Sequence, residues 1–170
     1  MATKTLLPIE VYNRTSYAPD REFIDGELRE RNVGTFEHAR IQLLLGTLFQ
    51  VHSREWNIQP VTECRMRVNE QRTRIPDLAV LSRGPHPSVL TDPPLIVVEV
   101  LSPDDTYGDM RERALDYSRM GIAHIWLVDP LTRTGQVFHE NRWNDVTEFA
   151  VPSTSVRITL ASLFAEFDEY

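Results

Sequence analysis

The sequence predicts an α/β fold built on a central mixed β-sheet flanked by helices. Two short aliphatic runs, residues 75–81 and 95–101, are bounded by proline and polar residues, which is typical of buried strands. A helical pattern at 107–120 leads to a third buried run at 124–128, so a helix connects two strands of one sheet. A later hairpin is expected to extend this sheet in the antiparallel direction.

The N-terminal half is expected to contain short elements and one long helix. Residues 8–20 read as a short helix or an irregular lead-in, and residues 21–30 as a hairpin that turns at Asp25-Gly26. A helix is predicted from Thr35 to about Arg54, because apolar residues recur at helical spacing: Ile41, Leu44, Leu45, Leu48 and Phe49. Its apolar face is expected to cover the sheet.

An extended run is predicted at residues 57–68, and residues 69–73 are expected to turn the chain back into the strand at 75–81. Near the end of this run, side chains alternate between faces. Cys64, Met66 and Val68 fall on one face, opposite Arg65 and Arg67. Residues 82–94, which contain four prolines, are expected to form a loop.

The C-terminal half is expected to complete the sheet. The helix after the 95–101 strand begins at Tyr107 or Asp109, with Asp109 as its N-cap, and Gly121 ends it after Met120. Strand 124–128 follows. A hairpin is then predicted from 134–140 and 145–150 around Asn141-Arg142, followed by a strand at 156–160 and a short helix at 161–167.

The composition is that of one globular domain. With 170 residues, of which 41% are hydrophobic and 25% charged, the chain can bury roughly 70% of the surface that it exposes when unfolded. The single cysteine, Cys64, excludes an internal disulfide framework and a zinc site built on a cysteine pair, and it fits a cytoplasmic protein. No signal peptide or membrane-length segment is expected.

The net charge of −7 argues against a protein that coats nucleic acid by bulk electrostatics, although a local basic groove is compatible with it.

Each of the first two aliphatic runs carries one carboxylate. Glu99 shares a strand face with Val97 and Leu101, where an ionised side chain is unfavourable unless it is paired or bound to a metal. Asp77 lies near the start of the other run, directly after a proline that keeps the chain extended. Two carboxylates that converge from neighbouring aliphatic strands suit a hard divalent cation. In the alternative interpretation, Glu99 pairs with a buried arginine and Asp77 caps a turn.

Several motifs occur in a fixed order between residues 20 and 140. They are Ile24-Asp25-Gly26-Glu27-Leu28, His38, Arg74-Ile75-Pro76-Asp77-Leu78-Ala79-Val80, Leu95-Ile96-Val97-Val98-Glu99-Val100-Leu101-Ser102-Pro103, Tyr117, Gly121 and Trp126-Leu127-Val128-Asp129-Pro130. This series resembles the Uma-two family of restriction-endonuclease-like proteins within the PD-(D/E)xK nuclease superfamily. The resemblance implies one restriction-endonuclease-like domain over residues 1–170, with its core at roughly 20–140.

The resemblance also implies an endonuclease that hydrolyses DNA phosphodiester bonds, with Glu27, Asp77 and Glu99 around Mg²⁺, for which Mn²⁺ can substitute. Mg²⁺ takes one or two carboxylates directly and keeps several waters. A water at or near the metal can attack phosphorus while the metal stabilises the developing charge. Judged from its residue type and position alone, Glu27 is equally well a solvated hairpin residue.

The sequence departs from the superfamily at its lysine. The position two residues after Glu99 holds Leu101, and the Uma-two family has this lysine on the following helix, four residues before the tyrosine. That position is Arg113 here, and Lys4 is the only lysine in the chain. Arginine stays charged and cannot act as a base at neutral pH, but it can hold a phosphate or stabilise charge on it.

Other residues carry weaker predictions. Four arginines upstream of the Asp77 run could contact DNA phosphates or line a solvated strand face, namely Arg65, Arg67, Arg72 and Arg74. His38 reads as a structural hydrogen-bonding residue or, less readily, as a catalyst. The missing lysine and the acidic charge keep a second hypothesis open, a catalytically inactive nuclease fold that serves as a binding or assembly module. A homodimer is expected by analogy, because a duplex has two strands.

Overall fold

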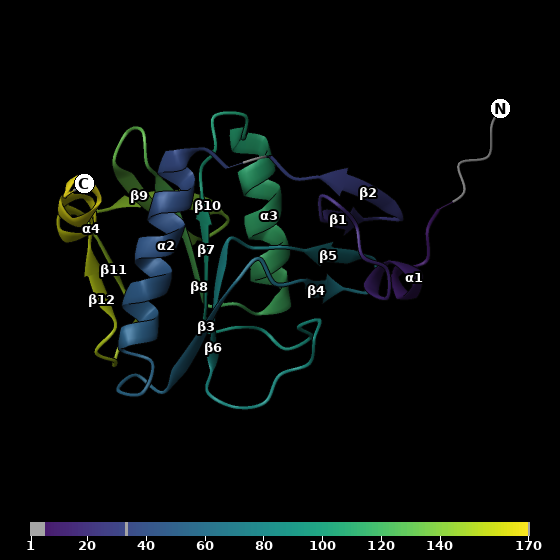
Figure 1. Cartoon of the computed structure of the whole chain (residues 1–170), viewed down its shortest axis with the longest axis horizontal. Coiled ribbons are helices and arrows are strands. Elements are labelled where there is room, and N and C mark those ends of the chain that lie inside the picture. Colours follow the sequence, from purple (N-terminus) through teal and green to yellow (C-terminus); the bar gives the residue numbers. More distant parts are fainter. Residues whose placement is uncertain (1–5, 33, 170) are drawn as a thin grey trace.

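A six-stranded mixed sheet forms the centre of the computed structural model, which describes residues 6–32 and 34–169 (Figure 1). Its strand order is β10-β9-β8-β7-β6-β3, with β7 and β8 parallel and the other neighbouring pairs antiparallel. The strands are β3 (Ile58–Thr62), β6 (Leu78–Ser82), β7 (Ile96–Val100), β8 (His124–Asp129), β9 (Thr134–His139) and β10 (Arg142–Val146). The predicted α/β fold with a central mixed sheet is confirmed.

Helices cover both faces of this sheet. Helices α2 (Phe36–Val51) and α4 (Leu160–Asp168) share one hydrophobic cluster with Ile96, Val98 and Val100 of β7. Helix α3 (Tyr107–Met120) packs on the opposite face, where its cluster includes Val97. The predicted alternation along β7 is therefore observed, and it turns Glu99 toward α3.

A second, four-stranded sheet lies beside the first, toward the N-terminus (Figure 1). Its order is β2-β1-β5-β4, and its strands are β1 (Arg21–Ile24), β2 (Glu27–Glu30), β4 (Met66–Asn69) and β5 (Arg72–Arg74). The predicted hairpin at 21–30 is thus confirmed, and the short helix α1 (Ile9–Asn13) precedes it. Strand β5, which pairs with both β1 and β4, ends at Arg74, shortly before β6 begins at Leu78.

Three boundaries differ from the sequence prediction. The extended run at 57–68 splits into β3 and β4, strands of different sheets, because Glu63 adopts a positive φ of 50° between them. Residues 69–73, predicted as a turn, contain the first residues of β5. The hairpin after β8 turns at Glu140-Asn141, both of which have positive φ, and the chain leaves the six-stranded sheet after β10. Strand β11 (Glu148–Ala150) pairs with β12 (Arg157–Thr159) in a separate small sheet.

The N-cap of α3 also differs from the prediction. Thr106 holds this position, and its Oγ1 accepts a hydrogen bond from the backbone N–H of Asp109 at 3.1 Å. The Thr106 hydroxyl in turn donates to Asp109 Oδ2 at 2.6 Å, so Asp109 supports the cap from the first turn. Gly121 ends the helix at a φ of 101°, as predicted. Among the described residues, no helix is long and apolar enough to cross a membrane.

Candidate active site

The structure brings Asp77 and Glu99 together at the junction of the two sheets. Strands β6 and β7 are antiparallel with Leu78 opposite Val98, so Asp77, just before β6, lies beside the end of β7. The backbone N–H of Val100 donates to Asp77 Oδ2 at 2.8 Å. Both carboxylates are buried, at 4% and 3% exposure, and they line a polar cavity of about 20 Å³, room for roughly one water or ion.

Asp77 is held from three directions. Besides the Val100 N–H, His38 Nε2 lies 3.2 Å from Oδ2, and Arg31 donates to Oδ1 at 3.0 Å. Burial by itself would raise the pKa of Asp77, but the hydrogen bond and charge of His38, the Val100 N–H and Arg31 outweigh it and lower that pKa. Asp77 is therefore ionised at neutral pH. His38 acts here as a hydrogen-bonding partner that orients this carboxylate.

Glu99 has a different protonation state. Both of its contacts fall on Oε1, which accepts a short hydrogen bond from the Tyr117 hydroxyl and lies 3.5 Å from Arg113 Nη1. Burial is the main cause that raises the pKa of Glu99 to about 8; Asp77 adds to the rise, whereas Arg113 and Tyr117 oppose it. Without a metal, Glu99 is thus protonated at neutral pH. The alternative in which Glu99 pairs with a buried arginine is present as a long ion pair with Arg113, since 3.5 Å exceeds a good hydrogen bond.

The firm partner of Arg113 is Glu22, a residue that the sequence prediction missed. Arg113 Nη1 donates to Glu22 Oε1 at 2.8 Å, and the same oxygen accepts from the backbone N–H of Ile75 at 3.0 Å. Arg74 Nη1 donates to the other oxygen at 3.0 Å. Glu22 is 1% exposed. Its hydrogen bonds connect Arg113 to the segment that carries Asp77. The one sequence signal for it is alternation, since Glu22 shares a strand face with the buried Ile24.

Glu27 lies elsewhere in the hairpin. It is exposed, begins β2 and pairs with Ile24 at the turn end, whereas Glu22 lies two residues before Ile24 and contacts the Ile75 backbone. The described residues that line the Asp77–Glu99 cavity do not include Glu27. The structure therefore brings Glu22 near the predicted pair, whereas Glu27 as a metal ligand stays a prediction.

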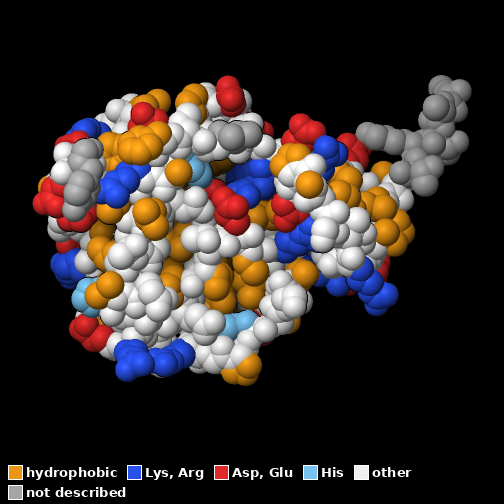
Figure 2. Space-filling view, viewed as in Figure 1, with side chains coloured by type: hydrophobic (Ala, Val, Ile, Leu, Met, Phe, Trp, Pro, Cys, Tyr) orange, Lys and Arg blue, Asp and Glu red, His pale blue; other side chains and the backbone are white. Residues whose placement is uncertain are grey.

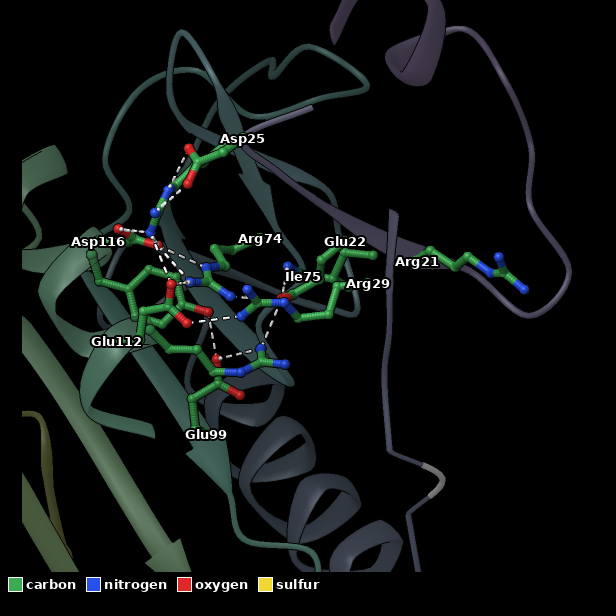
Figure 3. A network of polar contacts seen from close by, with 12 residues as sticks. Arg21, Glu22, Asp25, Arg29, Arg74, Ile75, Glu99, Glu112 and Asp116 are labelled. Atoms are coloured by element: carbon green, nitrogen blue, oxygen red, sulfur yellow. Dashed lines mark hydrogen bonds and ion pairs between the residues drawn. The ribbon is translucent and has the colours of Figure 1, made fainter. Parts of the chain in front are cut away.

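Two of the four arginines upstream of Asp77, Arg72 and Arg74, belong to an internal ion-pair network rather than to a surface for phosphates. Figure 3 shows Arg74 among Glu22, Glu112 and Asp116. At 1% exposure, Arg74 cannot reach a nucleic acid, which corrects that suggestion. Arg72 binds Asp25 and Asp116 in the same network.

The other two arginines lie outside this network. Arg65 is paired with Asp20 at 2.5 Å, and its guanidinium lies 4.5 Å from the centre of the Tyr12 ring. Arg67 donates from Nε to the carbonyl oxygen of Asn69 at 3.3 Å. In the space-filling view, acidic and basic side chains are interleaved on the visible face and form no continuous basic patch there among the described residues (Figure 2).

The donor set fits a hard divalent cation held by few protein ligands. Among the described residues, no three His, Cys, Asp or Glu side chains are grouped to hold a metal. Mg²⁺ needs no such cage, because it binds through one or two carboxylates and keeps its waters. Asp77 and Glu99 line one small cavity, and the charge of Asp77 already disfavours the ionised form of Glu99. A cation between them would relieve this repulsion. Lys4, the only lysine, lies outside the described residues.

Comparisons with known proteins agree with this architecture. The model of the Uma2 family, the Uma-two family named above, is described as "Putative restriction endonuclease" and matches residues 10–167. A crystal structure described as a putative nuclease belonging to DUF820, from Anabaena variabilis, superposes with a TM-score of 0.77 at 21% identity; the match covers 92% of this chain and 96% of that one. It shows that the two proteins share a fold.

A DrdV–DNA complex matches more weakly, with a TM-score of 0.41 and 14% identity over 74% of this chain and 11% of that one. Curated proteins gave no match. The family match spans nearly the whole sequence and includes every motif on which the resemblance was based. The chain therefore belongs to the Uma2 family of restriction-endonuclease-like proteins.

Proposed function

We propose that this chain is a Mg²⁺-dependent endonuclease that hydrolyses DNA phosphodiester bonds, with Asp77 and Glu99 as the metal ligands. The observation that carries the proposal is the pair of buried carboxylates around one small polar cavity, on a fold shared with a family described as restriction endonucleases. When bound, the metal supplies a Lewis acid for the scissile phosphate and lowers the pKa of a nearby water. Mn²⁺, which also accepts oxygen ligands, can take its place.

The side chains around the pair have distinct tasks in this proposal. His38 and the Val100 N–H fix the orientation of Asp77. Glu99 must give up its proton when a cation binds, because its pKa is raised to about 8. Binding should therefore tighten as the pH rises toward 8.

Arg113 takes the position of the superfamily lysine. Its guanidinium lies 3.5 Å from Glu99 Oε1, and Glu22 holds it in place. At 13% side-chain exposure, it also borders the cavity. Because its charge is permanent, its task is to stabilise negative charge on the phosphate rather than to remove a proton from water. A homodimer, with one active site for each strand of the duplex, remains our expectation by analogy.

One observation favours the second candidate, an inactive nuclease fold used for binding or assembly. In the structure, Asp77 already has a positive partner in Arg31. The sequence adds that Leu101 stands where the superfamily has its lysine. Such a protein would bind metal weakly or not at all. Metal binding and DNA nicking therefore distinguish the two candidates.

Thermal unfolding with and without metal tests the proposed ligands. A cation that binds only the folded state should stabilise the wild type by about 2.7 kcal/mol at a hundred times its dissociation constant. Mg²⁺ or Mn²⁺ should thus raise the melting temperature of the wild type but not of Asp77→Asn or Glu99→Gln. Without metal, Glu99→Gln should melt close to the wild type, because Glu99 is already neutral near pH 7. Equal metal-induced shifts in all three proteins would remove these residues from the metal site.

A further inference from the structure

Arg31 lines the cavity that the proposed cation would use. It follows β2 in the connection to α2, and its Nη2 donates to Asp77 Oδ1 at 3.0 Å. Its side chain is 17% exposed, so the contact lies at the edge of the cavity rather than in open solvent. In this state, the carboxylate of Asp77 is neutralised by an arginine.

The two oxygens of Asp77 are bound in different ways. Oδ2 is tied to the scaffold, because His38 comes from α2 and the Val100 N–H from β7. The described contact of Oδ1 is with Arg31, which lies on a connecting segment. Oδ1 is therefore the oxygen whose partner can change while the sheet and helices stay in place.

A divalent cation on Oδ1 and a guanidinium 3.0 Å from the same atom compete for the same negative charge. Two positive charges this close repel one another strongly in a buried site, where little water screens them. Metal binding at Oδ1 would then weaken the contact with Arg31, and the affinity of the site would include the cost of losing that ion pair.

Glu63 offers the displaced guanidinium a second partner. Arg31 Nη1 already lies 3.9 Å from Glu63 Oε2, and the Glu63 carboxylate is 56% exposed. The backbone N–H of Glu63 donates to the carbonyl oxygen of Asp77 at 3.4 Å, so the two acids stay close. A rotation of the Arg31 side chain toward Glu63 would suffice, without movement of the main chain.

We propose that Arg31 is an exchangeable counter-ion of the site, which holds Asp77 when no metal is present and competes with a divalent cation for Oδ1. This inference rests on the proposed metal site. It adds a residue that sets the metal affinity, and therefore the cation concentration at which the site becomes occupied.

Calorimetric titration of Mn²⁺ into the metal-free protein tests the competition without measuring activity. Arg31→Ala and Arg31→Gln remove the competing charge and should bind Mn²⁺ about tenfold more tightly than the wild type, or tighter still. Arg31→Lys keeps the charge and should bind within about twofold of the wild type. The matched control is Arg29→Ala, which removes a positive charge two residues away that pairs with Glu112 instead. It should also leave the affinity within about twofold, because an exposed charge is screened.

The outcomes separate this inference from the proposed function. Tighter binding by both neutral Arg31 variants, with Arg31→Lys and Arg29→Ala unchanged, supports it, as does binding that appears only in the neutral Arg31 variants. Unchanged or weaker binding by those variants overturns it, while loss of binding in Asp77→Asn would still support the metal site. An equal gain in Arg29→Ala also overturns it, because the effect would be general.

If neither the wild type nor any variant binds Mn²⁺, the proposed function itself fails. Should Arg31→Ala not fold, Arg31→Gln, which can still donate to Asp77, carries the test.

Discussion

Arg113→Ala is expected to lower the single-turnover rate of DNA nicking by about 10², the loss typical of one transition-state donor. Arg113 is the cation next to Glu99 that we propose in place of the superfamily lysine, and Glu22 holds its guanidinium at 2.8 Å. Arg113→Lys should keep most of the rate or improve it, because a point charge serves where a bidentate fork is not needed.

The rates must be compared at equal folded fraction, because Arg113→Ala also removes one donor from the buried Glu22. Arg111→Ala is the matched control, since Arg111 is an exposed arginine on the same helix. It should nick DNA at the wild-type rate. If Arg113→Ala also cuts as fast as the wild type, Arg113 does not replace the missing lysine and its role is limited to the ion pair with Glu22.

Arg74→Ala should destabilise the folded state by roughly 3–5 kcal/mol, the usual consequence of removing one partner from a buried ion pair. Arg74 donates to Glu22 Oε2 at 3.0 Å and to Asp116 Oδ2 at 2.8 Å, and all three side chains are buried (Figure 3). Its loss removes one of the two arginine partners of each carboxylate, because Glu22 keeps Arg113 and Asp116 keeps Arg72. Urea denaturation in the absence of metal measures the difference.

Arg157→Ala is the control for this loss of an ion pair. Arg157 pairs with Glu148 at 2.9 Å, but its side chain is 69% exposed. Exposed pairs contribute less than about 1 kcal/mol, so this variant should unfold close to the wild type. A similarly small effect of Arg74→Ala would mean that the network does not stabilise the junction between the sheets.

The sequence predicted the central sheet because its signal is local. Aliphatic runs with proline or glycine at their ends mark β6, β7 and β8, and the spacing of apolar residues marks α2 and α3. The prediction was wrong where the direction of the backbone depends on a single residue or on pairing with distant strands. The positive φ of Glu63 divides what reads as one strand, and β5 is too short and polar to be recognised without its partners β1 and β4.

The same distinction applies to the candidate site. Asp77 and Glu99 could be found because a carboxylate within or beside an aliphatic strand is conspicuous. Glu22 and Arg31 could not, because their roles depend on partners that are distant in sequence: Glu22 binds Arg74, 52 residues away, and Arg31 binds Asp77, 46 residues away. Glu27 was favoured by a motif; the hairpin places it at the turn, where it does not line the cavity.

Nicking of supercoiled plasmid DNA by the purified protein is the most direct test of a metal-dependent nuclease. The wild type should convert plasmid to the nicked form with Mg²⁺ or Mn²⁺ and should stop when EDTA removes the metal. Asp77→Asn, which loses the ionised ligand but keeps the size of the side chain, should leave the plasmid intact under the same conditions. Nicking that survives EDTA, or equal nicking by Asp77→Asn, would contradict this function, as would a folded, metal-bound wild type that never cuts.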